Sequence, residues 1–224
     1  MIICHTKKII FIKTKKTGGT SFEIALSKYC GSDCIITPIS PNDEKTRKNL
    51  GFRLAQNYKN YFWKKEKLRT NGHFINHLPA ANVKNSVPPQ VWAEYKKITI
   101  VRNPYDVAIS RYFFHGGEKT GMDFLTYLKN YPQHLKENEQ IAPLTGLTRL
   151  DFYLRYECLE TEFRDSGLDF MWKDFTKIKA KANTRPKEGA SITEMFQQFP
   201  SAAALIQQAC DTEIKTFGYK PIST

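Results

Sequence analysis

Two short segments of the sequence combine cations, hydroxyls and helix-start signals in patterns that bind anions. In the first, two lysines precede a glycine pair that is flanked by hydroxyl residues; its members are Lys15, Lys16, Thr17, Gly18, Gly19, Thr20 and Ser21. Glycines let the backbone approach an anion closely, and the first N–H groups of a following helix add positive partial charge. The segment therefore predicts a phosphate-binding loop.

This loop differs from the Walker A loop of kinases and ATPases. The Walker A motif places its lysine after the second glycine, whereas Lys16 precedes Gly18. The order disfavours a nucleotide-dependent kinase. A second interpretation is an ordinary strand-to-helix turn, in which Thr20 caps the helix and the lysines are solvated.

The second segment runs from Arg102 to Ser110. A planar guanidinium with a hydroxyl about two helical turns further on suits a phosphate monoester. Asn103 can cap a helix, and Pro104 can occupy its first position. The alternative is a surface arginine ahead of a well-capped helix.

Both segments need a strand before them and a helix after them. The apolar runs Ile9–Ile12 and Ile98–Val101 have the composition of buried strands. Thr20 and Glu23 fit a capping box, which predicts a helix that begins directly after the glycines. Strand, loop and helix alternate along the chain, so we expect an α/β fold with a mostly parallel sheet flanked by helices. Ligands bind at the carboxyl ends of such strands.

The remaining predicted elements follow from the same patterns. We expect a strand near residues 1–4 and another over 152–156, with turns or loops over 38–43, 84–90 and 173–187. Apolar periodicity predicts helices over 21–29, 46–68, 122–130, 159–165, 192–199 and 201–217.

Charge and cysteine usage narrow the class of protein. The 224 residues include 34 Lys and Arg against 22 Asp and Glu, which gives a net charge of +12 and favours an anionic ligand. A non-catalytic polyanion or nucleic-acid binder is therefore an alternative. The five cysteines form no Cys-x-x-Cys pair, which argues against a disulfide framework or a zinc site and favours free thiols.

Taken together, the two segments resemble the phosphate-binding motifs of sulfotransferases that use 3′-phosphoadenosine 5′-phosphosulfate (PAPS). The first is most similar to the Pro-Lys-Thr-Gly-Gly-Thr-Ser loop of carbohydrate O-sulfotransferases, including the heparan sulfate 2-O-sulfotransferase group. Lys16 matches the catalytic lysine, while Lys15 stands where proline is usual and Lys13 where histidine is frequent. The resemblance implies that Arg102 and Ser110 bind the 3′-phosphate.

The resemblance extends to the general base and to a late loop. Asn71–Phe74 is similar to the Gly-His segment that carries the base, which implies this role for His73, with His77 as a substitute. Asn183, Thr184 and Arg185 resemble the loop that closes over the donor, although a solvated charge run explains them as well.

The resemblance implies a single sulfotransferase domain over residues 1–224 with a P-loop-like PAPS-binding fold. Its reaction would move a sulfuryl group from PAPS to an acceptor hydroxyl, expected on a carbohydrate, without a metal. We expect no nucleic-acid partner. No apolar run is long enough to span a bilayer and no signal peptide is recognisable, so the expected location is cytoplasmic.

Overall fold

A five-stranded sheet lies at the centre of the fold. The computed structural model describes residues 1–59, 61–63, 68–178, 180, 185–186, 188 and 190–222, with the backbone alone for 61–63 and 68–72. The strand order is β3-β1-β2-β6-β7. The strands are β1 (Ile2–Cys4), β2 (Ile9–Phe11), β3 (Ile35–Ile36), β6 (Lys96–Val101) and β7 (Phe152–Arg155).

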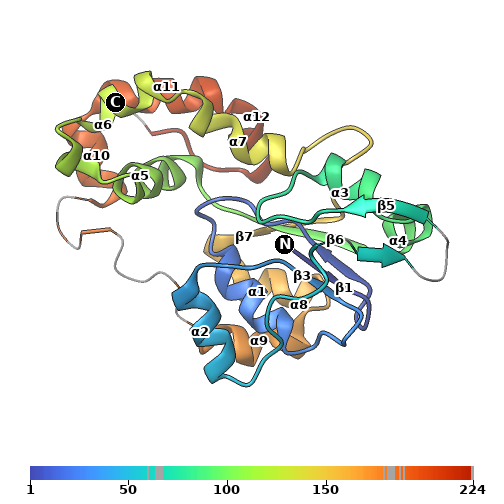
Figure 1. Cartoon of the computed structure of the whole chain (residues 1–224). Coiled ribbons are helices and arrows are strands. Elements are labelled where there is room, and N and C mark those ends of the chain that lie inside the picture. Colours follow the sequence, from blue (N-terminus) through green and yellow to red (C-terminus); the bar gives the residue numbers. More distant parts are fainter. Residues whose placement is uncertain are drawn as a thin grey trace.

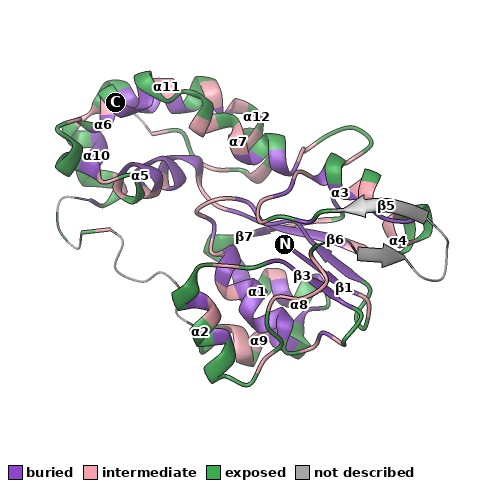
Figure 2. Cartoon of the chain, in the orientation of Figure 1, coloured by how far each residue is buried: buried purple, intermediate pink, exposed green. Residues whose placement is uncertain are grey.

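The strand directions confirm the predicted α/β class. β2 pairs with β6 and β6 with β7 in parallel, whereas β1 is antiparallel to both of its neighbours. Four of the five strands therefore run in one direction, with only β1 reversed. The buried strands and the helices around them are visible in Figures 1 and 2.

Alternating side chains of the sheet fill two hydrophobic layers. Ile9 of β2 faces a layer with α1 (Gly19–Ser27), α8 (Leu159–Asp165) and α9 (Asp169–Thr176). Ile10 faces the opposite layer, which includes side chains of α3 (Ala80–Ser86) and α4 (Pro89–Glu94). Because both faces are covered, the central strands have the continuous apolar sequence expected of parallel sheets.

A third hydrophobic cluster joins the helices that gather beside the sheet in Figure 1. Its aromatic centre includes Tyr105, Tyr112 and Phe124. The contributing helices are α5 (Pro104–Phe114), α6 (Phe124–Asn130), α10 (Ile192–Gln198), α11 (Pro200–Ala209) and α12 (Asp211–Phe217), and α7 (Gln133–Ile141) packs against α5 and α11. Short 3₁₀ turns, η1 (Gly117–Thr120) and η2 (Tyr156–Cys158), complete the chain.

The predicted helix over 46–68 is wrong. Helix α2 (Pro41–Asn49) begins earlier, since Ser40 accepts a hydrogen bond from the Asp43 amide and Pro41 takes the first position. It ends at Asn49, and Gly51 follows with a φ of +70°. Further along the chain, β4 (Tyr61–Trp63) and β5 (Leu68–Gly72) form an antiparallel pair. Aromatic residues at helical spacing also have high β-propensity, and here the pairing of β4 with β5 stabilises strands instead of a helix.

Other boundaries also differ from the prediction. The expected turn over 38–43 contains the start of α2, and the expected loop over 173–187 begins within α9, which ends at Thr176. The expected loop over 84–90 contains the end of α3 and the start of α4, which begins at Pro89. The expected helix over 201–217 is divided at Cys210 into α11 and α12. Within the described ranges, no helix combines the length and apolar character that a membrane crossing needs.

Candidate active site

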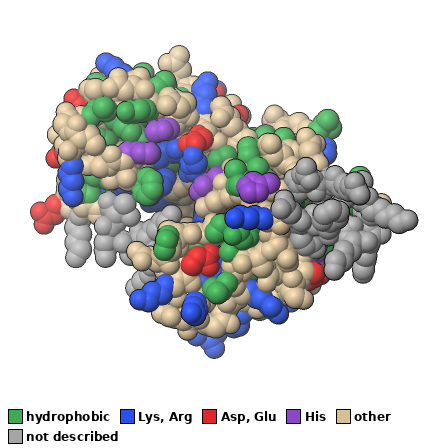
Figure 3. All heavy atoms as spheres, in the orientation of Figure 1, with side chains coloured by type: hydrophobic (Ala, Val, Ile, Leu, Met, Phe, Trp, Pro, Cys, Tyr) green, Lys and Arg blue, Asp and Glu red, His purple; other side chains and the backbone are tan. Residues whose placement is uncertain are grey.

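A cavity of about 470 Å³ opens at the sheet edge where β2 and β6 end. Figure 3 shows a hollow between the helical layer and the sheet, with Lys or Arg and His side chains around it. The lining comes from the two predicted phosphate segments, from α5 and α7, and from nearby loops: Lys13, Thr14, Lys15, Lys16, Gly18, Gly19, Thr20, Ser21, His77, Arg102, Ser110, Arg111, Phe114, His115, His134, Glu137, Tyr156, Ala180 and Arg185.

The first segment forms a tight loop ahead of α1. Lys16 and Gly18 both have left-handed backbones, with φ values of +64° and +85°. A Cβ atom at Gly18 would lie 2.9 Å from Cε2 of Tyr156, so the ring leaves no room for a side chain there. Gly18, the N-cap residue of α1, has no side chain that could cap the helix. The N–H groups of Gly19 and Thr20 at its start can therefore bind a ligand at the cavity.

The predicted capping box at Thr20 and Glu23 is wrong. Glu23 is fully buried and forms ion pairs with Lys13, at 2.5 Å, and with the Met1 amino group. Burial would raise the pKa of Glu23, but the Met1 amino group and Lys13 together lower it to about 2. Glu23 therefore pairs with buried cations instead of a backbone N–H, and Thr20 lies inside the helix, which begins at Gly19.

Helix α7 fixes the loop from the other side. The backbone N–H of Lys15 donates to Oδ1 of Asn138 at 2.8 Å, and Nδ2 of Asn138 donates to the Lys15 carbonyl at 2.9 Å. Glu137 pairs with the Lys15 ammonium and with Arg111, the latter at 2.5 Å. Burial would raise the pKa of Glu137, but hydrogen bonds from Lys15 and Arg111 lower it below its usual range.

The two predicted segments meet directly at the cavity. Nη1 of Arg102 donates to the Lys16 carbonyl at 3.2 Å, and the Arg102 guanidinium lies 4.5 Å from the centre of the Tyr156 ring. Nε of Arg102 also donates to Asp106 at 2.6 Å, and Arg185 pairs with the other oxygen of the same carboxylate. These contacts hold two guanidiniums at one end of the cavity.

The structure separates the two candidate bases. His77 lines the cavity, and its Nδ1 lies 2.9 Å from the Lys13 carbonyl. Because a carbonyl accepts hydrogen bonds, this contact puts the proton on Nδ1 and leaves a lone pair on Nε2. Burial, and then the charge of Lys13, lowers the pKa of His77 to about 4. His73 is exposed and does not line the cavity.

A stacked pair of histidines lines the helical wall of the cavity. The rings of His115 and His134 lie 4.9 Å apart at 13°, and Nδ1 of His134 is 2.8 Å from the Tyr127 hydroxyl. Burial, followed by the positive charge of Arg111, lowers the pKa of both imidazoles. Both rings are therefore uncharged at neutral pH.

The structure places most of the predicted ligand-binding residues in this lining. Thr17 is the exception among the described loop residues, since it is buried behind the loop with its hydroxyl 2.8 Å from that of Thr14. Arg185 lies in the lining, and Asn183 and Thr184 lie outside the described residues.

Sequence reasoning gave no ligand-binding role to several further residues of the lining: Arg111, Phe114, His115, His134, Glu137 and Tyr156. Arg111 carried a signal, because it directly follows Ser110, and His115 and His134 are among the five histidines that the sequence offers as candidate bases.

The fold and the cavity define an α/β protein with a glycine loop and an arginine at the carboxyl ends of parallel strands, the place where such folds bind ligands. The model of the sulfotransferase family matches residues 1–210. The chain therefore belongs to the sulfotransferase family and is an enzyme of that class, and this family generally uses PAPS as its donor. Comparison with curated proteins and with solved structures finds no match.

Proposed function

We propose that the protein transfers a sulfuryl group from PAPS to a hydroxyl of a carbohydrate or glycoconjugate. The observation that carries this proposal is the meeting of the two phosphate segments in one cavity, where Arg102 donates to the Lys16 carbonyl at 3.2 Å. A donor with phosphates at its 3′ and 5′ positions has two anionic ends, and the cavity offers one cationic segment for each.

The residues present fit such a donor. The uncapped start of α1, together with Thr20 and Ser21, would hold the 5′-phosphosulfate. Arg102 and Ser110 would hold the 3′-phosphate, with Arg185 beside them. The Arg102 guanidinium already pairs with Asp106, which fixes its plane before the ligand binds.

Lys16 is the proposed catalytic cation. Its ammonium lies over the Phe114 ring, 4.1 Å from the centroid, at the cavity. PAPS supplies the sulfuryl group, whose bond to the 5′-phosphate oxygen breaks as a bond to the acceptor oxygen forms. A cation at the leaving oxygen stabilises the charge that develops there, and the protein otherwise contributes positioning.

We assign the general base to His77 rather than to His73. His77 lies in the cavity lining with Nε2 able to accept a proton, whereas His73 is exposed outside the lining. A polyanionic donor in the cavity would raise the basicity of His77 by offsetting the charge of Lys13.

The carbohydrate acceptor comes from the resemblance to the carbohydrate O-sulfotransferases. The uncharged imidazoles of His115 and His134 and the half-exposed Phe114 ring offer hydrogen-bonding groups and flat apolar surface on the wall opposite the glycine loop. Such a wall suits a neutral hydroxyl-bearing ligand.

Calorimetry with adenosine 3′,5′-bisphosphate tests the donor site. We expect one stoichiometric site, and Arg102→Ala should weaken binding about 10–100-fold because a charge-assisted bidentate contact is lost. Arg164→Ala is the matched control, since Arg164 is 66% exposed on α8 and does not line the cavity. The proposal fails if the nucleotide does not bind, or if Arg102→Ala and Arg164→Ala bind it equally well.

A further inference from the structure

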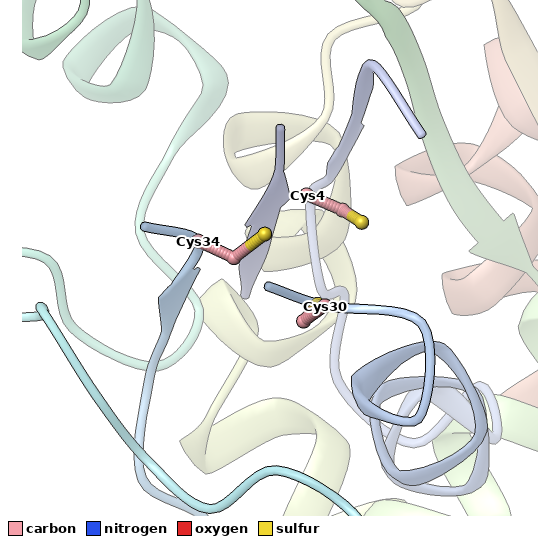
Figure 4. A group of neighbouring side chains, drawn as sticks. All are labelled: Cys4, Cys30 and Cys34. Atoms are coloured by element: carbon pink, nitrogen blue, oxygen red, sulfur yellow. The ribbon is translucent and has the colours of Figure 1, made fainter. Parts of the chain in front are cut away.

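Three cysteines that are far apart in the sequence converge in the fold. Cys4 ends β1, Cys30 follows the last turn of α1, and Cys34 directly precedes β3. Figure 4 shows the three side chains reaching one place from these three segments. Their sulfur atoms all lie within 4.8 Å of one another, and all three residues are buried. The sequence did not predict this cluster, because none of its cysteines form the Cys-x-x-Cys pair that is typical of metal sites.

We propose that Cys4, Cys30 and Cys34 form a three-thiolate site for a thiophilic d¹⁰ cation, Zn²⁺ or Cu⁺. Metal–sulfur bonds of about 2.3 Å place sulfurs about 3.8 Å apart in a tetrahedral site and about 4.0 Å apart in a trigonal one. The observed separations reach these values with side-chain movements of about 1 Å. Soft thiolate sets select Zn²⁺ and Cu⁺ over the hard cations.

Hydrogen-bonding groups lie close to Sγ of Cys34. The Gly31 N–H donates to Sγ of Cys34 at 3.2 Å, and the Thr6 hydroxyl lies 3.7 Å from the same sulfur. Donors around a ligating sulfur are typical of metal–thiolate centres, in which they orient and stabilise the ligand.

The site would tie the far end of α1 to the sheet. Helix α1 spans 9 residues, with its start at the cavity and Cys30 beyond its end. At 1.5 Å per residue the helix is about 13 Å long, so the metal would not touch the donor. Binding replaces the thiol protons by the cation with no change in oxidation state, and it joins α1 to β1 and β3. The role is therefore structural, and it is independent of the proposed reaction.

The two cations differ in their need for a fourth ligand. Structural Zn²⁺ is almost always four-coordinate, whereas three thiolates satisfy Cu⁺. Oδ1 of Asp33 lies 3.9 Å from Sγ of Cys34 and offers a carboxylate for a fourth position. Asp33→Asn should therefore weaken Zn²⁺ binding about 10-fold or more and leave Cu⁺ binding unchanged.

Metal uptake by the reduced, full-length protein tests the proposal. The protein is loaded separately with Zn²⁺, with Co²⁺ as a spectroscopic probe for Zn²⁺, and with Cu⁺, then dialysed and assayed for bound metal. We expect about one equivalent, with thiolate-to-Co²⁺ charge-transfer absorption, and a melting temperature raised by about 5–10 °C at 100-fold excess over the Kd. Cys34→Ser should abolish uptake. Cys158→Ser is the control, because Cys158 is exposed and outside the cluster.

A second measurement needs no variant and covers the case in which Cys34→Ser does not fold. Alkylation of the native wild-type protein, read by peptide mass spectrometry, should show that metal protects Cys4, Cys30 and Cys34 while Cys158 reacts at its metal-free rate. The proposal is overturned if no metal is retained, if Cys34→Ser binds it as well as wild type, or if the reduced cluster only forms a disulfide in air.

Discussion

The two predicted phosphate segments each join a strand to a helix at the cavity, but the two helices differ in whether a side chain caps their first turn. Helix α1 begins at Gly19 with no side-chain cap, and its first turn carries no acidic residue. Helix α5 begins at Pro104, where the Asn103 side chain accepts from the Tyr105 amide and Asp106 adds a negative charge. An uncapped helix start leaves its backbone N–H groups to an anion, whereas the Asn103 side chain already occupies the Tyr105 N–H at the start of α5. In the proposed donor complex, the second segment would therefore bind mainly through Arg102 and Ser110.

The largest effect that we predict concerns His77, the proposed base, which contacts the Lys13 carbonyl just before the first segment. His77→Ala should lower kcat on the order of 10²–10⁴-fold, because no group would take the acceptor proton. Binding of adenosine 3′,5′-bisphosphate should change little. Since the pKa of free His77 is about 4, kcat/KM of the wild type should stay level as the pH falls from 8 to below 6. His73→Ala is the control, and loss of turnover in that variant alone would return the base to His73.

The next effect separates the two lysines of the first segment. Lys16→Ala should reduce kcat about 10²–10³-fold, the usual cost of removing one group that stabilises developing charge. Lys15→Ala should cost less than about 10-fold, because the Lys15 ammonium is already paired with Glu137. Steady-state kinetics with saturating PAPS measures both. Equal losses in the two variants would show that the loop acts only as a diffuse positive charge.

A smaller effect tests the capped start of the second segment. Asn103→Ala should lower stability by about 1 kcal/mol and the melting temperature by about 2–4 °C, with nucleotide affinity nearly unchanged. Ser40→Ala is the matched control, since Ser40 caps α2 in the same manner away from the cavity. A loss of affinity specific to Asn103→Ala would mean that this start also binds the ligand.

The smallest effect concerns the packing behind the first segment. Glu213 of α12 borders the same small internal pocket as Thr14. Burial, and then the nearby Glu139, raises the pKa of Glu213 from 4.5 to about 8. The stability that depends on its protonated form is complete below pH 4.5 and is lost as the pH rises toward 8.

Glu213→Gln keeps this position uncharged at every pH. It should raise the melting temperature by about 3–5 °C at pH 9 and have almost no effect at pH 4. Scanning calorimetry at both pH values measures the difference, with the exposed Glu160→Gln as control. A shift of the same size at both pH values would contradict the raised pKa.

Local patterns predicted the elements whose signals lie within a few residues. The apolar runs gave β2 and β6, and Asn103–Pro104 gave the start of α5. The predicted helix over 46–68 failed because the pairing of β4 with β5, a contact between separate segments, overrides a helical stripe. The capping box failed for the same kind of reason. Its Glu23 found a stronger partner in Lys13, which the fold buries beside it.

The sequence by itself determined the α/β class, the order of the two phosphate segments and the residues that form them, because strand composition and helix-start chemistry are local. Only the tertiary structure decided that His77 lines the cavity while His73 does not, and that α7 closes its far wall. It alone gathered Cys4, Cys30 and Cys34. The cavity lining and the cysteine cluster depend on which distant segments pack together, and the spacing of residues along the chain does not predict that packing.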